Sequence, residues 1–423
     1  MKLNKVKLGE VLDVKRGTSL AGKYYDVSGD KIRLTLGNFN YPRGGFKLNT
    51  SKKDVYFNGP VKDEFVLQKG DVITPLTEQV RGLLGETARI PKSNIFVQSG
   101  DIGLLVPNEE KIDKSFMYHL FSSDLIKEQL SKGAQQTKIR HTSPDKIKNC
   151  IAWLPELDIQ RKIGNFLDNI DQEITNNNFI SKELELMAET IYDYWFLQFE
   201  FPNESGEPYK SSDGKMIWND ILKKKIPEGW EVKKLQDLVK LGNGINYSKD
   251  TSGDNLYKIV NVRDITSSSL LINDRSLTKI SLPNTNIDKY LVNNNDILIA
   301  RSGTPGAVRI LTSTSEQILF AGFIIHCLPN NPALRWYLMY SLKKLEGTNA
   351  TTTGGSILQN VSQTTLKSIS IILPTAPIIE KFNQQITPVV EQLENLLKES
   401  QQLKSLRDFL LPMLMNGQVT IKD

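Results

Sequence analysis

Hydrophobic and polar positions follow the same order twice along this chain. A short amphipathic stretch runs into a glycine turn at Gly17, and another does so at Gly244. In each copy an apolar strand follows an acidic residue, over residues 71–73 and 296–299, and a polar loop comes next. A period of roughly 200 residues is too long for a solenoid or propeller repeat. The pattern therefore indicates an internal duplication with two similar domains.

The body of each copy mixes short strands, polar turns and a few short helices. Residues 257–262 alternate between apolar and polar positions, whereas residues 116–130 and 334–345 have helical spacing. In both copies a last apolar strand stops at a proline, Pro155 or Pro374. This mixture predicts an α+β fold for each domain.

Each copy ends in a segment with the heptad spacing of a long, paired helix. Alternate steps of three and four residues from Ile379 to Leu410 meet mostly apolar residues. A single amphipathic helix more often packs on its own domain, but two matching seams in a duplicated chain predict that the helices pack on each other. Pro388 lacks a backbone donor and should kink the second helix, so that its seam begins late. The first seam is predicted at Ile163, Phe166, Ile170, Glu173, Asn177, Ile180, Leu184, Met187, Ile191 and Tyr194.

Composition narrows the class of protein without identifying it. A chain of 423 residues exceeds what one core usually organises, so at least two domains are expected. No apolar run is long enough to span a bilayer and no signal-peptide core is present, which predicts a soluble, cytoplasmic protein. The only two cysteines, Cys150 and Cys327, leave no disulfide framework and no Cys-x-x-Cys zinc site. A net charge of +5 permits nucleic-acid binding but does not require it.

The motifs of catalysis are missing. Residues 17–23 have the spacing of a phosphate loop, but Tyr24 stands where Ser or Thr must hold magnesium. His119, His141 and His326 have no metal-ligand spacing. There is also no glycine-rich turn for a methyl donor, no Asn-Pro-Pro or Asp-Pro-Pro motif, and no nuclease-type acidic pair with lysine on a buried strand. We therefore expect no catalytic residue, cofactor or metal in this chain.

Each copy has two polar loops with side chains suited to DNA. Arginine can donate two hydrogen bonds to guanine, and glutamine can pair in the same way with adenine, so such loops are candidates for reading the major groove. One arginine in a loop is usually just solvated, and only the recurrence in both copies favours binding. Because the loops of the two copies differ in chemistry, they should read different sequences. The candidate DNA-binding residues are Thr77, Gln79, Arg81, Gln135, Gln136, Lys138 and Arg140 in the first copy, and Arg301, Ser302, Thr304, Thr352 and Thr353 in the second.

Several segments resemble the specificity subunits of type I restriction-modification systems. Residues 154–163 resemble the junction of the first domain with its helix, and residues 188–196 and 226–230 resemble the linker that leads into the second domain. Residues 296–303 resemble the family's strand and loop, and residues 407–417 resemble its C-terminal motif. The resemblance covers essentially the whole chain. The first copy departs from the family pattern in its loop, where Thr-Pro-Leu-Thr replaces the arginine-serine-glycine turn.

The resemblance implies a non-catalytic subunit that binds a bipartite DNA sequence. Its fold would be two similar target-recognition domains joined by two long antiparallel coiled-coil helices. Its partners would be double-stranded DNA, two methyltransferase subunits docked on the helices, and restriction subunits for cleavage. S-adenosylmethionine, ATP and magnesium would be used by those partners. The expected division is 1–153 for the first recognition domain, 154–200 for the first spacer helix, 201–229 for a linker, 230–373 for the second recognition domain, 374–412 for the second spacer helix and 413–423 for the tail.

Two other classes of protein remain open from the residues alone. One is a self-sufficient DNA methyltransferase or nuclease whose motifs are too divergent to see. The other is a coiled-coil scaffold with no role in DNA binding.

Overall fold

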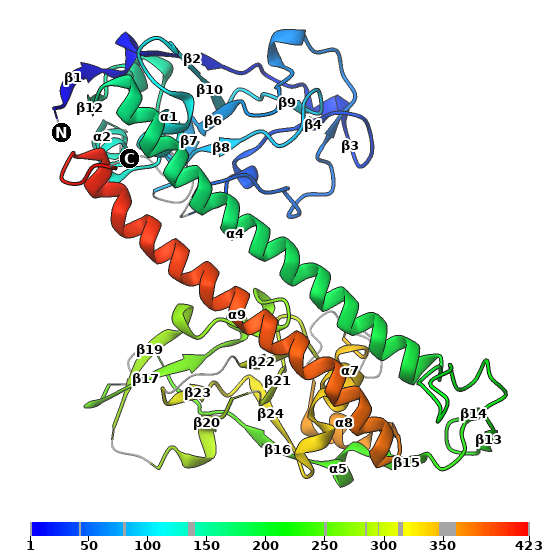
Figure 1. The fold of residues 1–423 in the computed structure, drawn as a ribbon. Coiled ribbons are helices and arrows are strands. Elements are labelled where there is room, and N and C mark those ends of the chain that lie inside the picture. The colour runs from blue at the N-terminus through cyan, green and yellow to red at the C-terminus, as the bar shows by residue number, and fades with distance from the viewer. Residues whose placement is uncertain are drawn as a thin grey trace. The chain divides into compact units, whose positions relative to one another are not determined.

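The computed structural model divides the chain into two compact units. Unit 1 consists of Met1–Thr175 and Gln401–Asp423, and unit 2 consists of Asn176–Ser400. Both units combine helices with sheets, which confirms the predicted α+β fold (Figure 1). The structure describes residues 2–41, 44–78, 82–133, 140–248, 252–283, 286–294, 296–311, 316–346 and 361–421.

Unit 1 is organised around an antiparallel sheet with the strand order β2-β10-β6-β8. Smaller sheets β3-β5-β4-β9, β1-β12 and β11-β7 flank it. Val14 and Leu105 of the main sheet share a core with Phe116, which lies on the short helix α1. The strands are β1 (Asn4–Lys7), β2 (Leu12–Arg16), β3 (Tyr25–Asp26), β4 (Ile32–Arg33), β5 (Tyr56–Phe57), β6 (Val72–Pro75), β7 (Thr77–Glu78), β8 (Ala88–Arg89), β9 (Phe96–Val97), β10 (Ile102–Pro107), β11 (Arg140–His141) and β12 (Ile151–Leu154), and the short helices are α1 (Lys114–Phe121), α2 (Asp124–Gly133) and α3 (Pro144–Lys148).

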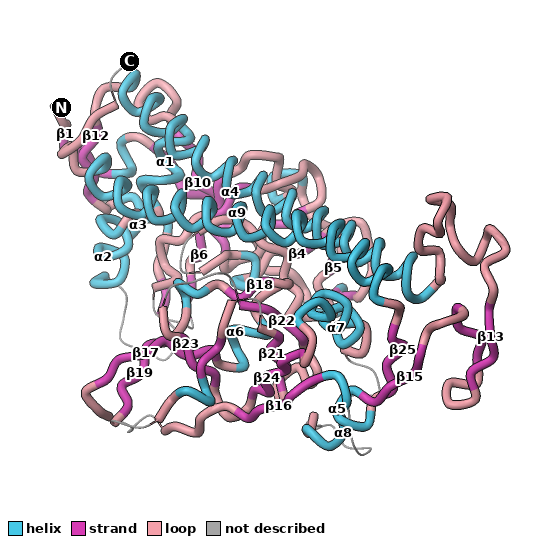
Figure 2. The backbone as a smooth tube through the Cα atoms, turned by 60° about the horizontal axis from the view of Figure 1, so that its bottom comes forward, coloured by secondary structure: helices cyan, strands magenta, loops and turns pink. Residues whose placement is uncertain are grey.

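Unit 2 repeats this arrangement. Its main sheet has the order β16-β24-β21-β22-β18, in which the first four strands correspond to β2-β10-β6-β8 of unit 1 (Figure 2). A second sheet, β19-β17-β23-β20, lies beside it, and β15 pairs with β25 as β1 pairs with β12. The strands are β13 (Met216–Asn219), β14 (Lys224–Pro227), β15 (Glu231–Lys234), β16 (Val239–Asn243), β17 (Asn255–Val260), β18 (Leu271–Ile272), β19 (Thr278–Leu282), β20 (Leu291–Val292), β21 (Ile297–Ala300), β22 (Val308–Leu311), β23 (Ile318–Phe320), β24 (Ile324–Pro329) and β25 (Ser370–Leu373), and the short helices are α5 (Leu235–Leu238), α6 (Val262–Thr266), α7 (Arg335–Lys343) and α8 (Gln363–Ser368).

The chain contains two long helices, α4 (Leu157–Tyr192) and α9 (Ala376–Met415), and a π-helical turn extends α4 to Leu197. In unit 1, Asp171 of α4 forms an ion pair with Arg407 of α9. In unit 2, Asn177 donates a hydrogen bond to Glu399 (3.1 Å). Because the later part of α4 meets the earlier part of α9, the helices pair antiparallel, as the family resemblance implies.

The buried face of α4 differs from its predicted seam. Ile180, Met187 and Tyr194 are exposed, whereas Ile174 and Ala188, which the stepping missed, are buried. A seam counted at 3.5 residues per turn drifts by roughly 20° per heptad on a straight α-helix, so the prediction leaves the true buried face toward the end of the helix.

The predicted seam of α9 is correct. Ile379, Phe382 and Ile386 are all buried, so the seam starts in the first turn of the helix. The delay expected from Pro388 is therefore wrong, because one continuous α-helix includes this residue.

The segment predicted as a linker is folded. Phe201 stacks on Trp230 and on Tyr209, with ring centroids 5.0 and 4.5 Å apart. Strands β13 and β14 form a hairpin that follows this aromatic stack. In the part of the chain that the structure describes, no helix is long and apolar enough to cross a membrane.

Candidate nucleic-acid interface

The glycine turn that recurs in the sequence is a point of close backbone approach. A Cβ atom at Gly17 would lie 2.2 Å from the carbonyl oxygen of Ser99. One at Gly244 would lie 2.2 Å from the carbonyl oxygen of Ala321. Real Cβ atoms never come that near to backbone oxygen, so only glycine lets the two segments cross. The turn is therefore part of the scaffold that carries the loops.

Arg301, a predicted DNA-binding residue, helps to hold this crossing. Its Nη1 donates to the carbonyl of Gly322 at 3.2 Å. In unit 1 the equivalent carbonyl, that of Gly100, accepts from Nε of Arg16 at 2.8 Å. Each unit thus uses an arginine at the same place, but from a different strand. Arg301 is half-buried, and its Nε is buried without a hydrogen-bond partner among the described residues.

The loop after Arg301 is a tight turn that presents polar groups. Gly303 and Gly306 have φ values of +78° and +84°, and the amide of Gly306 donates to the carbonyl of Ala300 at 2.8 Å. Thr304 is exposed and Ser302 is half-buried. Positive φ angles cost glycine nothing, which explains the two glycines here. The turn therefore holds both hydroxyl groups on a rigid strand end.

The predicted residues of the first copy lie at the base of their loops. Thr77 is buried on β7. This strand pairs with β11, whose first residue is Arg140. Arg140 forms an ion pair with the buried Glu78 at 2.9 Å. This pair fastens the strand that precedes the first loop to the strand that follows the second. Gln79, Arg81, Gln135, Gln136, Lys138, Thr352 and Thr353 lie outside the described residues.

One backbone hydrogen bond joins the two predicted loops in each unit. In unit 1 the amide of Thr142, just after the second loop, donates to the carbonyl of Leu76 at 2.9 Å. In unit 2 the amide of Val361 donates to the carbonyl of Arg301 at 3.0 Å. Leu76 directly follows β6 and Arg301 directly follows β21, which are corresponding strands of the two main sheets. Residues that flank these loops, and that are far apart in sequence, thus meet at the same strand end in both copies.

Sequence reasoning missed a basic cleft in unit 2. The cleft has a volume of about 590 Å³ and is lined by Tyr257 and by Lys258, Arg275 and Lys279. Lys258 and Lys279 lie directly opposite each other on paired strands, an arrangement that repels. Glu316 neutralises Lys258 through an ion pair. The alternation of apolar and polar residues in β17 was visible in the sequence, but the pairing of β17 with β19 was not.

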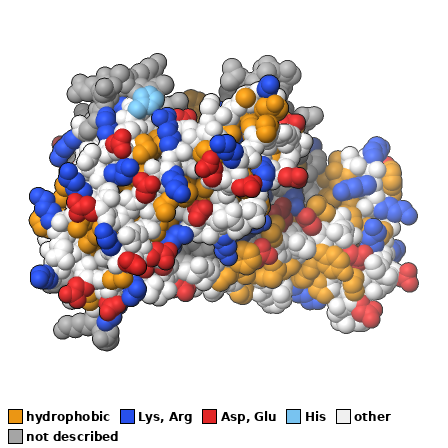
Figure 3. Space-filling model, turned by 90° about the horizontal axis from the view of Figure 1, so that it is seen from above, with side chains coloured by type: hydrophobic (Ala, Val, Ile, Leu, Met, Phe, Trp, Pro, Cys, Tyr) orange, Lys and Arg blue, Asp and Glu red, His pale blue; other side chains and the backbone are white. Residues whose placement is uncertain are grey.

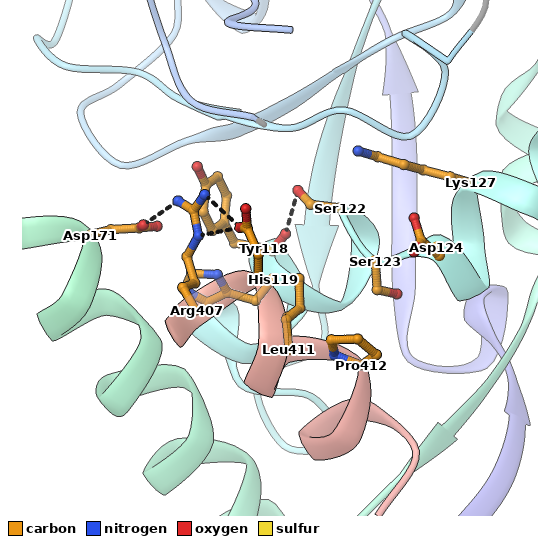
Figure 4. A pocket seen from close by; sticks show the side chains of 11 residues that line it. Tyr118, His119, Ser122, Ser123, Asp124, Lys127, Asp171, Arg407, Leu411 and Pro412 are labelled. Atoms are coloured by element: carbon orange, nitrogen blue, oxygen red, sulfur yellow. Dashed lines mark hydrogen bonds and ion pairs between the residues drawn. The ribbon is translucent and has the colours of Figure 1, made fainter. Parts of the chain in front are cut away.

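A pocket of about 280 Å³ in unit 1 is lined by charged groups that neutralise one another (Figure 4). Arg407, on the last turns of α9, pairs with Asp171 at 2.6 Å and with Asp408 at 3.0 Å. Tyr118 closes the pocket, and burial raises its pKa to about 12. The pocket lies where the end of α9 packs against helices of unit 1, and we assign it no ligand.

Asp168 of α4 is the centre of a second joint in unit 1. It accepts hydrogen bonds from His119 (2.7 Å) and Ser115 (2.6 Å) and pairs with Arg89 at 2.8 Å. Burial alone would raise the pKa of Asp168, but these three partners outweigh it and hold the pKa at about 2. The carboxylate therefore stays charged and ties α4 to two other elements.

Known proteins share this architecture. A family model described as the type I restriction modification DNA specificity domain matches residues 2–186 and 227–407. The MjaIX type I restriction enzyme specificity subunit of Methanocaldococcus jannaschii is 25% identical over 338 residues, which cover 75% of this chain and 72% of that one. The HindI specificity subunit of Haemophilus influenzae is 21% identical over 415 residues, with 85% and 89% covered.

One solved structure has the same fold over nearly the whole chain. It is the S subunit of a type I restriction-modification system from M. genitalium, with a TM-score of 0.56, 15% identity and coverage of 98% of this chain and 96% of that one. The family model accounts for both copies of the internal repeat. The chain therefore belongs to the family of type I restriction modification DNA specificity domains.

Proposed function

We propose that this chain reads a bipartite DNA sequence, with one half read by each copy, and that it has no catalytic centre of its own. The observation that carries the proposal is that the residues flanking two polar loops converge on one strand end in both units. Two separate readers on similar scaffolds fit a target of two half-sites. We assign residues 1–153 and 230–373 to the two recognition domains, with the spacers and tail as the sequence predicts.

In the second domain, base reading falls to the loop that follows Arg301. The exposed hydroxyl group of Thr304 can donate to or accept from a base edge, and the guanidinium group of the half-buried Arg301 can donate to guanine. Lys279 and Arg275, at the cleft beside β17, are placed to contact phosphates. In the first domain we keep Thr77 and Arg140 as supports for the readers Gln79 and Arg81.

Two methyltransferase subunits are the partners that the long helices suit best. On α4, several large apolar side chains are exposed to solvent on one face of the helix, and we name this face the α4 stripe. Met187 of this stripe follows Pro155 in sequence by the same number of residues as Leu406 of α9 follows Pro374. Both side chains are exposed. Phe409, one turn after Leu406, is exposed as well. The α4 stripe consists of Phe179, Ile180, Leu186, Met187, Tyr194 and Leu197.

Equivalent exposed positions on two duplicated helices suit two copies of one partner. We propose that restriction subunits join this assembly for cleavage. S-adenosylmethionine, ATP and magnesium would then be bound by the partners, and the complex would act on DNA in the cytoplasm.

Mapping of methylated adenines tests the proposal. In cells with the cognate methyltransferase, this chain should direct methylation to a motif of two short halves and a fixed gap, and deletion of the gene should abolish it. Methylation that persists without the chain would refute the proposal. Binding of S-adenosylmethionine by the isolated chain would favour a self-sufficient enzyme instead, and an assembly that binds no DNA would favour a scaffold.

A further inference from the structure

The exposed faces of the two long helices are unequal. The positions of α9 that correspond to Phe179 and Leu186 of the α4 stripe are Lys398 and Ser405, whereas the exposed Phe409 of α9 corresponds to Thr190. Phe179 is 64% exposed, which is unusual for so large an apolar side chain unless a partner covers it. A partner that buries apolar surface would therefore gain more on α4 than on α9.

A second exposed apolar surface lies on the β13-β14 hairpin, and we name it the hairpin patch. Trp218 and Ile221 are 58% and 65% exposed. Trp218 lies directly opposite Lys225 on the paired strand, so both side chains are on one face. The side chain of Asn219 accepts hydrogen bonds from the amides of Ile221 and Leu222, which fixes the tip. The hairpin patch consists of Trp218, Ile221, Lys223, Lys224 and Lys225.

The hairpin patch lies next to the end of the α4 stripe. The ammonium group of Lys224 is 5.6 Å from the ring centroid of Phe199, two residues after Leu197, where the stripe ends. Figure 3 shows hydrophobic side chains gathered on the side of the molecule where Figure 1 draws the end of α4 and the hairpin.

The chemistry of the hairpin patch favours a protein over DNA. Lys223 lies near Asp220 (3.7 Å), and the lysines of the patch stand beside the exposed apolar side chains of Trp218 and Ile221, which contacts to a phosphate backbone alone would not bury. Ile221 forms one wall of a pocket of about 390 Å³ that also includes Val232. Tryptophan and aliphatic groups rimmed by lysine match a protein surface that has an apolar centre and acidic edges.

We infer that the methyltransferase subunit docked on the α4 stripe also binds the hairpin patch, so that the two copies of this partner bind with unequal affinity. The inference rests on the proposed function, because it takes the methyltransferase as the partner. The copy on α4 and the hairpin binds first and tightly. The copy on α9 binds second and more weakly.

The test is a titration of the full chain with its cognate methyltransferase subunit, followed by native mass spectrometry and calorimetry. We expect two steps, with the first Kd about tenfold or more below the second. Trp218→Ala should weaken the first step about tenfold and leave the second unchanged. Trp153→Ala is the matched control, because Trp153 is an exposed tryptophan on β12 in unit 1. It should change neither step.

A second variant tests the charge of the hairpin patch. Lys225→Glu should weaken the first step and reduce its dependence on salt. Two equal Kd values for the unaltered chain, or a first step that neither variant weakens, would overturn the inference and leave the proposed function standing. Variants that weaken only DNA binding by the assembled complex would assign the patch to DNA. A chain that binds no methyltransferase at all would contradict the inference and the proposed function together.

Discussion

At the scale of single residues, the same side chain can serve the fold and the site. Arg301 supports the crossing at Gly322, as Arg16 does at Gly100 in the other unit. It does not pair with Asp296, whose carboxylate instead lies 2.9 Å from His326. A change at Arg301 is therefore expected to affect stability and, under the proposed function, recognition.

Arg301→Ala should relax the target sequence at one position of the half read by the second domain. Loss of a hydrogen bond from the charged arginine to guanine costs about 1–3 kcal/mol of binding. Loss of the hydrogen bond to Gly322 should lower the unfolding free energy by about 1 kcal/mol. Binding to DNA variants and thermal melting measure the two effects. Arg16→Ala is the control, with a similar loss of stability and no change in the second half. Uniform weakening on all sequences would mean that Arg301 contacts only phosphate.

Asp168 makes stability depend on pH in a defined direction. Its pKa of about 2 is below the ordinary value of 3.8, so its contribution is complete above about pH 4 and is lost as the pH falls through about 2. Asp168→Asn should lower the unfolding free energy at pH 7 by about 2 kcal/mol, and the difference from the unaltered chain should shrink toward pH 2.

Urea unfolding at several pH values measures this difference. Asp158→Asn is the control, because Asp158 is an exposed residue of the same helix that pairs with the exposed Arg161. Such surface pairs contribute little, so this change should have a small effect at every pH. A constant difference between Asp168→Asn and the unaltered chain from pH 7 to pH 2 would contradict the assignment of the charge effect to Asp168.

At the scale of elements, the helix pair has a polar segment in its middle. Asn177 is buried and bonded to Glu399, and Ser400 and Gln401 next to it are buried as well. A buried asparagine in a helix seam is satisfied in only one register, which suits helices that act as spacers.

Lengthening both spacers should widen the gap between half-sites. Four residues inserted after Asn177, with four matching residues inserted after Glu399, add about 6 Å to each helix at about 1.5 Å per residue. This is close to two base pairs of DNA at about 3.4 Å each. Methylation mapping should show the same two halves with a gap about two base pairs wider. An unchanged gap would rule out the helices as the ruler.

At the scale of the whole molecule, each unit carries one copy of the repeat. Unit 1 also includes the end of α9, since Leu414 and Met415 belong to the same core as Ile163. A recognition domain is therefore separable from its partner domain but not from the helix ends on which it packs.

Exchange of residues 1–150 for the matching part of a relative should replace one half of the recognition sequence only. The donor should keep Tyr118 and His119, which line the pocket below Arg407. Methylation mapping of the hybrid checks the result. A donor that differs only outside the predicted loops provides the control and should leave both halves unchanged. A hybrid with both halves altered would show that the domains do not read independently.

The amino-acid sequence by itself determined the duplication, the α+β class and the two long helices. Such features depend on local periodicity and turn chemistry, which each segment carries in its own residues. The seam of α9 is of this kind, and so is the strand before Arg301. The candidate donors at Ser302 and Thr304 also follow from local pattern.

Only the tertiary structure decided which residues meet. The pairing of β7 with β11 turned Arg140 from a free loop residue into the partner of Glu78. The pairing of β17 with β19 created the cleft at Lys279. On α4, the choice of buried face followed from the true helical period and from the surfaces that α9 and the domains offered, so Met187 lies outside. Contacts of this kind depend on segments far apart in the chain, and no local pattern contains them.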